Sequence, residues 1–360
     1  MRAALISLQS TSSQWTAAAM KKYFDEFDDL NIKNIEVHAV DNQLQIFYGG
    51  KPLKLYDCIY VKGSFRYEPV LRSITAALYD KAYMPLTPES FTLGHDKLLT
   101  HLALQRNSIP MPKTYIVATA EEGRKLLERI HYPIVMKFPS GTQGKGVMFA
   151  DSFASASSLL DAMATLKQPL LIQEYIETGG RDIRALVIGD KVVAAMERIA
   201  VEGEKRANIH AGATGEAKIL DAYTQKIAIQ TVRAIGADIC AVDMLAGPKG
   251  PLVIEVNLSP GLQGITQATN VDVADKIAQF LHRKTKEWIE SQKDSSTKKI
   301  IEEVETKKII KREMITSLSL KGNRIILPEV ITNLSGFQEH DDVEIKTEKG
   351  QVTIKKFDVK

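Results

Sequence analysis

Two apolar segments near residue 250 are joined by a turn and carry polar residues at matching positions. Asp243 interrupts the first segment, Glu255 and Asn257 interrupt the second, and the stretch Gly247–Gly250 supplies the turn. An antiparallel hairpin that turns there is expected to place Asp243 opposite Glu255, with Asn257 on the same face. Three such oxygen ligands suit Mg²⁺, with phosphates completing its shell. The alternative is a solvent-facing polar stripe, which the strongly apolar flanks disfavour.

A second motif is glycine-rich and lies between two predicted strands. Gly141, Gly144 and Gly146 are spaced so that the backbone can close over phosphates and present its N–H groups to them. Lys137, four residues before the first of these glycines, adds a positive charge on the preceding strand. The motif is no P-loop, because no Gly-Lys-Ser/Thr opens a helix. A plain glycine hairpin is the alternative.

Two further segments combine charged residues with glycine or other small residues. In 203–213, Arg206 is a candidate for an oxyanion or a γ-phosphate, and Asn208 for a metal-bound oxygen or a substrate carboxylate. In 179–184, two glycines precede Asp182 and Arg184, which alternate on a predicted strand. A surface ion pair between Asp182 and Arg184 is the alternative.

Composition excludes several classes of protein. The 360 residues are 44% hydrophobic, which is enough to bury a core without disulfides or a structural metal. Cys58 and Cys240 form no CxxC pattern, so a cysteine-ligated zinc site is excluded and a reducing cytosol is expected. The net charge of +3 is too balanced for nucleic-acid binding by the whole chain. The first residues are no secretory signal or membrane span, so we expect a cytoplasmic protein with no membrane partner.

The order of predicted elements divides the chain into four parts: a small α/β domain over 1–92, a larger domain over 93–283, a charged helix or linker over 284–312, and a strand-rich module over 313–360. Helical spacing predicts helices over 17–27, 67–81, 94–104, 120–130 and 222–235. Strands are predicted over 3–8, 34–40, 56–61, 114–117, 133–138, 146–150 and 183–188, and a last hairpin over 238–260.

Taken in order, these motifs resemble the ATP-grasp ligases, and within them the RimK-type α-L-glutamate ligases. The resemblance covers about residues 56–283. It is carried by Asp96-Lys97, Lys137, GTQGKGV (141–147), IQEYI (172–176), GGRDIRALVIGDKVVAAMER (179–198), RANIH (206–210), AVDML (241–245) and IEVNLSPGL (254–262). It implies a chain of mixed α/β and α+β class with an ATP-grasp fold: a small α/β N-terminal layer, then two α+β subdomains that clamp ATP, with a small all-β dimerisation module at the C-terminus.

The resemblance also implies roles for individual residues. Adenine and ribose would lie near Glu174 and the backbone of Tyr175 and Ile176, and Lys97 and Lys137 would hold phosphates beneath the glycine lid. The implied ATP-binding residues are Lys97, Lys137, Gly141, Thr142, Gln143, Gly144, Gly146, Glu174, Tyr175, Ile176 and Asp182; the metal ligands are Asp243, Glu255 and Asn257; the catalytic residues are Arg184, Arg206 and Asn208.

The implied chemistry is a carboxylate–amine ligation that consumes ATP, with one or two Mg²⁺ ions, for which Mn²⁺ is a substitute. ATP would convert a carboxylate into an acylphosphate, which an amino acid, expected to be L-glutamate, would attack. The expected acceptor is a protein or peptide C-terminus or a glutamyl-tailed coenzyme. One alternative is a ligase for an amino-acid precursor bound to a carrier protein. Another is a DNA-binding regulator whose ATP-grasp body senses a metabolite.

The tail, 317–357, resembles the AbrB/SpoVT swapped-hairpin module through the stretch Gly322-Asn323-Arg324-Ile325-Ile326-Leu327-Pro328. Such modules are usually interlocked dimers, so the resemblance implies a homodimer or homotetramer. A tail of under fifty residues with few large apolar side chains would also be marginally stable alone. DNA binding by the module is not favoured, because its basic residues are offset by a similar number of acidic ones.

Overall fold

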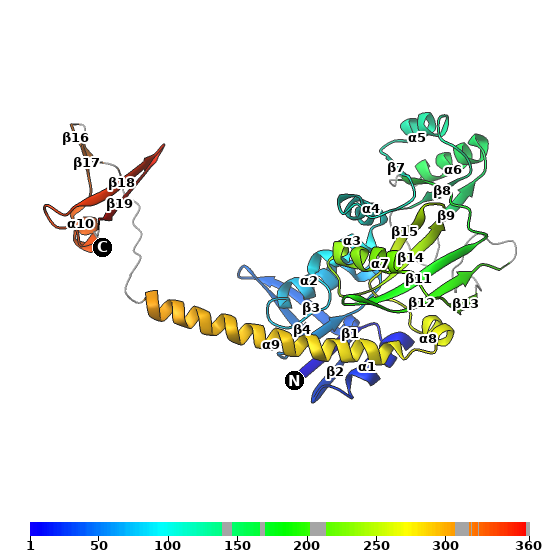
Figure 1. The fold of residues 1–360 in the computed structure, drawn as a ribbon, viewed down its shortest axis with the longest axis horizontal. Coiled ribbons are helices and arrows are strands. Elements are labelled where there is room, and N and C mark those ends of the chain that lie inside the picture. Colours follow the sequence, from blue (N-terminus) through cyan, green and yellow to red (C-terminus); the bar gives the residue numbers. More distant parts are fainter. Residues whose placement is uncertain are drawn as a thin grey trace. The chain divides into compact units, whose positions relative to one another are not determined.

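The computed structural model describes residues 1–138, 146–165, 170–201, 214–306, 317, 319–322 and 324–357. They belong to two compact units, Met1–Ser295 and Ser296–Lys360. In Figure 1 the first unit consists of several small sheets with helices packed on them; the second consists of the end of the long helix Val273–Thr306, two short hairpins and a further helix. In the described part of the chain, no helix is both long enough and apolar enough to cross a membrane.

The first sheet is parallel, with the strand order β2-β1-β6. Its strands are β1 (Arg2–Ser7), β2 (Glu26–Asn31) and β6 (Cys58–Val61), and α1 (Thr11–Met20) follows β1. The predicted helix over 17–27 is therefore wrong in its second half, where the chain turns after Met20 and enters the edge strand β2 at Glu26. The segment EFDDLN lacks the apolar alternation of a strand, and its pairing with β1 is a tertiary effect that overrides local preference.

A small meander, three α-helices and two short 3-10 helices complete the N-terminal region. They are η1 (Ile32–Asn34), β3 (Ile35–Val40), β4 (Gln43–Tyr48), β5 (Lys51–Pro52), η2 (Phe65–Tyr67), α2 (Glu68–Leu78), α3 (Pro88–His95) and α4 (Lys97–Arg106). Where the sequence predicted one helix over 94–104, the structure has the end of α3 and most of α4. Asp96 has an extended backbone, and its side chain accepts a hydrogen bond from the Leu99 N–H (3.0 Å), so it caps α4 and breaks the chain from α3.

The next sheet is antiparallel, with the order β7-β10-β8-β9. Its strands are β7 (Thr114–Val117), β8 (Ile134–Lys137), β9 (Val147–Ala150) and β10 (Leu170–Glu174). Helices α5 (Ala120–Leu127) and α6 (Phe153–Thr165) pack against each other and against this sheet, as Figure 1 shows. The sheet and its helices enclose a separate apolar core that includes Leu127, Met136 and Leu160.

The largest sheet is also antiparallel, with the order β13-β12-β11-β14-β15. Its strands are β11 (Arg181–Ile188), β12 (Lys191–Ile199), β13 (Thr214–Ala217), β14 (Ile239–Gly247) and β15 (Gly250–Asn257); α7 (Ala222–Ile235) packs against four of them, and α8 (Gln263–Thr269) against β12 and β13. Asp243 pairs with Glu255 across β14 and β15, which confirms the predicted hairpin. One continuous apolar core joins this sheet to the N-terminal sheet.

The chain leaves the core through α9 (Val273–Thr306), whose first turns bury Val273, Ile277 and Leu281. The described part of the charged segment after residue 283 is thus helical. The second unit contains β16 (Ser319–Lys321), β17 (Arg324–Ile326), α10 (Glu329–Ser335), β18 (Val343–Glu348) and β19 (Gln351–Lys356), paired as two separate antiparallel hairpins.

Candidate functional site

One face of the five-stranded sheet carries a row of charged side chains. Arg184 on β11 donates through Nε and Nη2 to the two carboxylate oxygens of Asp243 on β14, at 2.8 and 2.7 Å. Glu255 on β15 pairs with Asp243 across the hairpin. The Asn257 amide donates to Asp243 Oδ2 at 3.4 Å. The structure thus brings together four residues that the sequence had marked as candidates.

Arg198 on β12 is a further member of this row that the sequence motifs do not single out. It donates to both oxygens of Asp182, at 2.6 and 2.8 Å, and its Nη2 lies 3.0 Å from Asp243 Oδ2. Its side chain is only 3% exposed. Arg198 therefore joins the two buried aspartates, and the oxygens of Asp182 point at this arginine.

The two aspartates differ in electrostatic environment. Burial acts to raise the pKa of Asp243, but Arg184 and Arg198 outweigh it and lower that pKa to about 2. Burial raises the pKa of Asp182 to about 6, against the opposing effect of Arg198. Asp243 is therefore ionised at neutral pH, whereas Asp182 has a pKa much closer to neutral pH and is more easily protonated.

Lys137 approaches the charged row from the four-stranded sheet. It is the last residue of β8, and its buried ammonium donates to Gln173 Oε1 at 2.7 Å. Burial lowers the pKa of Lys137 to about 8, with Glu255 acting in the opposite direction. Burial and Asp243 raise the pKa of Glu255, while Lys97, Arg184 and Lys137 oppose that rise. Lys97 on α4 and Lys137 on β8 thus lie within electrostatic range of Glu255 on the five-stranded sheet.

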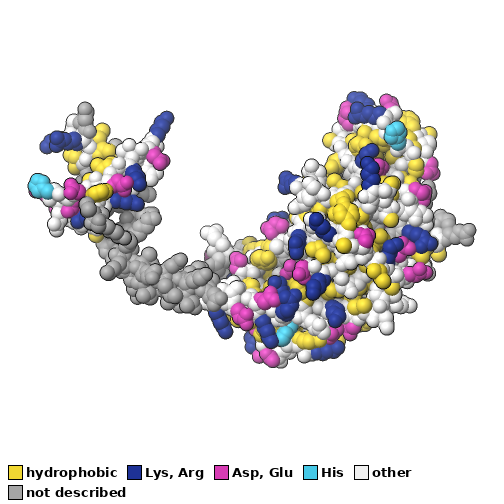
Figure 2. Space-filling view, in the orientation of Figure 1, with side chains coloured by type: hydrophobic (Ala, Val, Ile, Leu, Met, Phe, Trp, Pro, Cys, Tyr) yellow, Lys and Arg dark blue, Asp and Glu magenta, His cyan; other side chains and the backbone are white. Residues whose placement is uncertain are grey.

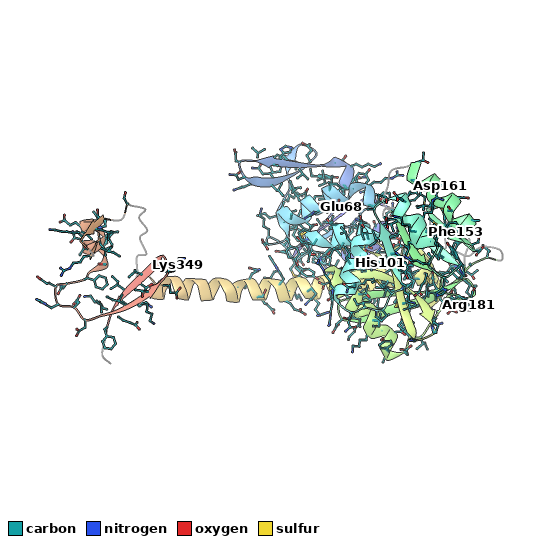
Figure 3. All side chains as sticks on the ribbon, turned by 90° about the horizontal axis from the view of Figure 1, so that it is seen from above. Glu68, His101, Phe153, Asp161, Arg181 and Lys349 are labelled. Atoms are coloured by element: carbon teal, nitrogen blue, oxygen red, sulfur yellow. The ribbon has the colours of Figure 1, made fainter. Side chains whose placement is uncertain are left out.

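A hydrogen-bond chain connects the two lysines. His101 lies inside the first unit (Figure 3), and its Nδ1 is 2.6 Å from the Lys97 carbonyl oxygen, which can only accept. Burial lowers the pKa of His101 to about 4, so the ring is neutral and its Nε2 accepts from the Gln173 amide at 3.0 Å. The amide oxygen of Gln173 is then directed to Lys137. The sequence by itself indicates no role for His101 or for Gln173, although Gln173 lies within the motif IQEYI (172–176).

The last residue of β10 and the two that follow it are the residues expected near adenine and ribose. Glu174 accepts from the Lys113 backbone N–H through Oε1 at 2.8 Å. The Tyr175 ring lies edge-on to Phe149, with 5.9 Å between centroids. Ile176 follows directly. These contacts tie the end of β10 to the residue before β7 and to β9, while Glu174 pairs with Ile134 at the start of β8.

Several expected site residues lie outside the described residues: Gly141, Thr142, Gln143 and Gly144 of the glycine lid, and Arg206 and Asn208 of the basic segment. Gly146 is described and has a φ of +77°. A Cβ at Gly146 would lie 2.9 Å from the Phe138 ring, so both its backbone conformation and its surroundings favour glycine.

The donor chemistry around Glu255 fits Mg²⁺. Burial beside the like charge of Asp243 disfavours ionised Glu255, and a cation would relieve this cost. Asp243 Oδ1 accepts from Arg184 alone among the described residues and keeps a lone pair for a metal. No group of three His, Cys, Asp or Glu gathers within the described ranges, so an ion here would need the Asn257 amide oxygen as a third ligand.

Solved structures share this arrangement of sheets. A RimK-domain ATP-grasp protein from Sphaerobacter thermophilus superposes with a TM-score of 0.61 at 19% identity, covering 78% of this chain and 99% of that one. The ATP-grasp ligase PsnB, solved with a minimal precursor, Mg and ADP, superposes with a TM-score of 0.62 at 16% identity, covering 79% of this chain and 98% of that one. The fold is therefore an ATP-grasp fold, as expected.

The sequence comparisons are more specific. Residues 94–281 match the RimK-like ATP-grasp domain. A "probable alpha-L-glutamate ligase" of Shewanella loihica is 42% identical over 195 residues, or 54% of this chain and 65% of the relative's length. A protein of the same description from Legionella pneumophila is 37% identical over 257 residues, or 69% of this chain and 83% of the relative. The chain belongs to the RimK-like ATP-grasp family.

Proposed function

We propose that this chain is an ATP- and Mg²⁺-dependent carboxylate–amine ligase that adds L-glutamate to a carboxylate acceptor. The observation that carries the proposal is a convergence of charges from separate elements: Glu255, beside Arg184 and Asp243 on the five-stranded sheet, lies within electrostatic range of Lys97 on α4 and Lys137 on the four-stranded sheet. The names of the Shewanella and Legionella relatives support glutamate as the amino acid.

The proposed reaction uses electrostatics rather than a covalent enzyme intermediate. The acceptor carboxylate takes the γ-phosphoryl group of ATP, which releases ADP and forms an acylphosphate. The amino group of glutamate then attacks the acyl carbon, the new C–N bond forms, and phosphate leaves with the C–O bond electrons. In this proposal Lys97 and Lys137 bind the phosphates, and Arg184 and Arg206 stabilise the charge of the transferred group.

Asp243, Glu255 and Asn257 would hold the metal. Bound Mg²⁺ would supply positive charge against the phosphate oxygens. In this arrangement Arg198 is a positioning residue that orients Asp243 and keeps both buried aspartates paired.

The acceptor is proposed to be a protein or peptide C-terminus or a glutamyl-tailed coenzyme. The direct test is ADP release by the full chain with Mg-ATP, each of the twenty amino acids, and a fraction of small molecules and peptides from cell extract. Glutamate-dependent release with a product heavier by one or more glutamyl units supports the proposal. Dependence on another amino acid contradicts glutamate. ADP release only in the presence of a carrier protein would favour a ligase that acts on an amino-acid precursor bound to that carrier.

Replacing Lys137 by methionine is expected to weaken ATP binding by about 10- to 100-fold, because a charge-assisted contact to phosphate is lost. The pKa of Lys137 is about 8, so raising the pH from 7 to 9 removes its proton. Wild-type affinity for ATP should therefore fall by about tenfold over this interval, and the variant should lack that component. Calorimetric titration with ATP at each pH measures both effects.

Lys125→Met is the matched control, because Lys125 on α5 is exposed and pairs only with nearby glutamates among the described residues. Lys137→Met should not lower the melting temperature, since burying a charged lysine disfavours the folded state at pH 7. Equal ATP affinity in the two variants would contradict a phosphate-binding role for Lys137.

We also propose that the second unit joins two copies of the chain. None of its described residues is buried. Its exposed apolar side chains include Leu320, Ile325, Ile345, Val352 and Phe357, each at least 50% exposed. A segment without an apolar core needs a partner surface. Both signs of charge are interspersed on the face of this unit shown in Figure 2, which suits a protein partner better than DNA.

Ile345→Asp in the full chain is expected to halve the mass measured by sedimentation. Ile345 pairs with Ile354 across β18 and β19, so the two share a face, and a charge there would oppose burial against a second copy. Lys349→Asp, at the tip of the same hairpin (Figure 3), is the control and should keep the wild-type mass. An unchanged mass for Ile345→Asp, or a monomeric wild type, would refute the assembly role.

A further inference from the structure

Lys62, the residue directly after β6, has a buried ammonium group that the proposed chemistry does not use. The residue is 3% exposed, and its backbone N–H donates to the Ile6 carbonyl at 2.8 Å, continuing the pairing with β1. Among the described residues its Nζ has no hydrogen-bond acceptor; it lies 5.6 Å from the centre of the Tyr60 ring. The Tyr60 hydroxyl, on the same face of β6, also has no described hydrogen-bond partner.

This unpaired charge disfavours the folded state. Burial is the cause that lowers the pKa of Lys62 to about 8, so the side chain still carries its proton at pH 7. Buried charges in proteins are normally paired, because an isolated one loses its hydration without compensation. A methionine of similar shape would fill the same space without this cost. An anionic group from outside the described chain would supply the missing partner.

The location of Lys62 indicates which kind of anion would bind it. Lys62 lies at the carboxyl edge of the parallel sheet, where α/β proteins bind ligands. The next residue, Gly63, donates its N–H to Ser259 Oγ at 2.9 Å, and Ser259 follows the metal-candidate residue Asn257 by two positions. Ser12 accepts from the Leu262 N–H at 2.8 Å, so the same loop also touches α1. Lys62 is thus beside the loop that leaves the proposed metal strand.

We propose that Lys62 binds a substrate carboxylate at this edge, where the N-terminal sheet meets the loop after β15. The proposal rests on the proposed function, because a ligase of this kind handles carboxylates on both its amino acid and its acceptor. Phosphates have their own lysines, Lys97 and Lys137, near the other sheet. The flexible four-carbon stem of Lys62 allows Nζ to turn from the Tyr60 ring towards the entering group.

The test is calorimetric titration of the full chain, without nucleotide, with two carboxylate probes. L-Glutamate represents the incoming amino acid, and N-acetyl-Glu-Glu, which lacks a free amine, represents an acceptor. Lys62→Met is expected to bind one of the probes about 10- to 100-fold more weakly than wild type. Lys62→Arg should retain much of the affinity. The probe that is affected identifies the substrate whose carboxylate Lys62 holds.

Lys54→Met is the control, since Lys54 is an exposed lysine of the same region that pairs with Asp28. Lys62→Met should keep the ATP affinity of wild type and a melting temperature at least as high as that of wild type. If the methionine variant fails to fold, Lys62→Gln is used in its place. Three results would overturn the proposal. Wild type and Lys62→Met could bind both probes equally, wild type could bind neither probe, or inorganic phosphate alone could compete with the probe for its site. Failure of the proposed function would appear separately, as absent ATP binding or ADP release.

Discussion

Glu255→Gln is expected to lower ADP release by about 10²–10³-fold while the chain stays folded. The substitution keeps the shape of the side chain but removes the negative charge that would hold Mg²⁺. Burial and the neighbouring Asp243 raise the pKa of Glu255, which means that its ionised form disfavours the folded state at neutral pH. The melting temperature of the variant should therefore equal or exceed that of wild type. Coupled-enzyme detection of ADP and a thermal scan measure the two quantities.

Glu197→Gln is the matched control for this prediction. Glu197 lies in the same sheet and pairs with Ile183, so its side chain is on the face opposite Asp182. It forms ion pairs with Arg181 and Lys218 rather than with the site. Its replacement should leave ADP release within about twofold of wild type, as expected for a carboxylate outside the site. Equal rates of ADP release by the Glu255→Gln and Glu197→Gln variants would contradict a metal-binding role for Glu255.

Arg198→Met is expected to lower the free energy of unfolding by about 3–5 kcal/mol, because it leaves two buried carboxylates without their shared partner. Asp182 would then lose both of the hydrogen bonds that Arg198 donates to its oxygens. Removing the arginine should raise the pKa of Asp182 above its present value of about 6, so acidification from pH 7 to 5 should recover part of the loss. Urea unfolding at both pH values tests the size and the direction of the effect.

Arg181→Met provides the comparison, since Arg181 also forms an ion pair between β11 and β12, with Glu197, but its side chain is 51% exposed. An exposed pair of this kind contributes about 0.2–1 kcal/mol. Equal destabilisation by the two substitutions would show that Arg198 is not the buried link between Asp182 and Asp243.

Much of the candidate site follows from local sequence. Strongly apolar segments interrupted by Asp243, Glu255 and Asn257, with glycines at the turn between them, predicted a hairpin with these residues on one face, and the structure confirms the pairing of Asp243 with Glu255. The helix over 222–235 begins and ends as predicted, because Asp221 caps its start and Gly236 adopts the left-handed conformation at its end.

Other parts depend on contacts between segments distant in the chain. The polar strand Glu26–Asn31 forms only because β1 offers it an edge. His101 and Gln173 become part of the site because α4 and β10 bring them together across 72 positions of sequence. No local sequence pattern indicates a role for Lys62. The residue stands out only in the structure, where its ammonium group is buried without a described hydrogen-bond acceptor.

Residue types, apolar alternation and turn chemistry act over a few neighbours, so they indicated the hairpin and the charged residues that the site needs. The ordered motifs carried the resemblance to the ATP-grasp ligases. The predicted pairing of Asp243 with Glu255 and the pairing of Asp182 with Arg198 both depend on bulges, which the residue pattern alone does not place. Counting back from the Gly247–Gly250 turn without a bulge pairs Asp243 with Ile254, and an irregularity beside Met244 shifts that partner to Glu255. A second irregularity, between Leu186 and Val187, gives Asp182 the partner Arg198 in place of Glu197. Because a shift of one residue moves a side chain to the other face of a sheet, these two bulges assemble the charged row.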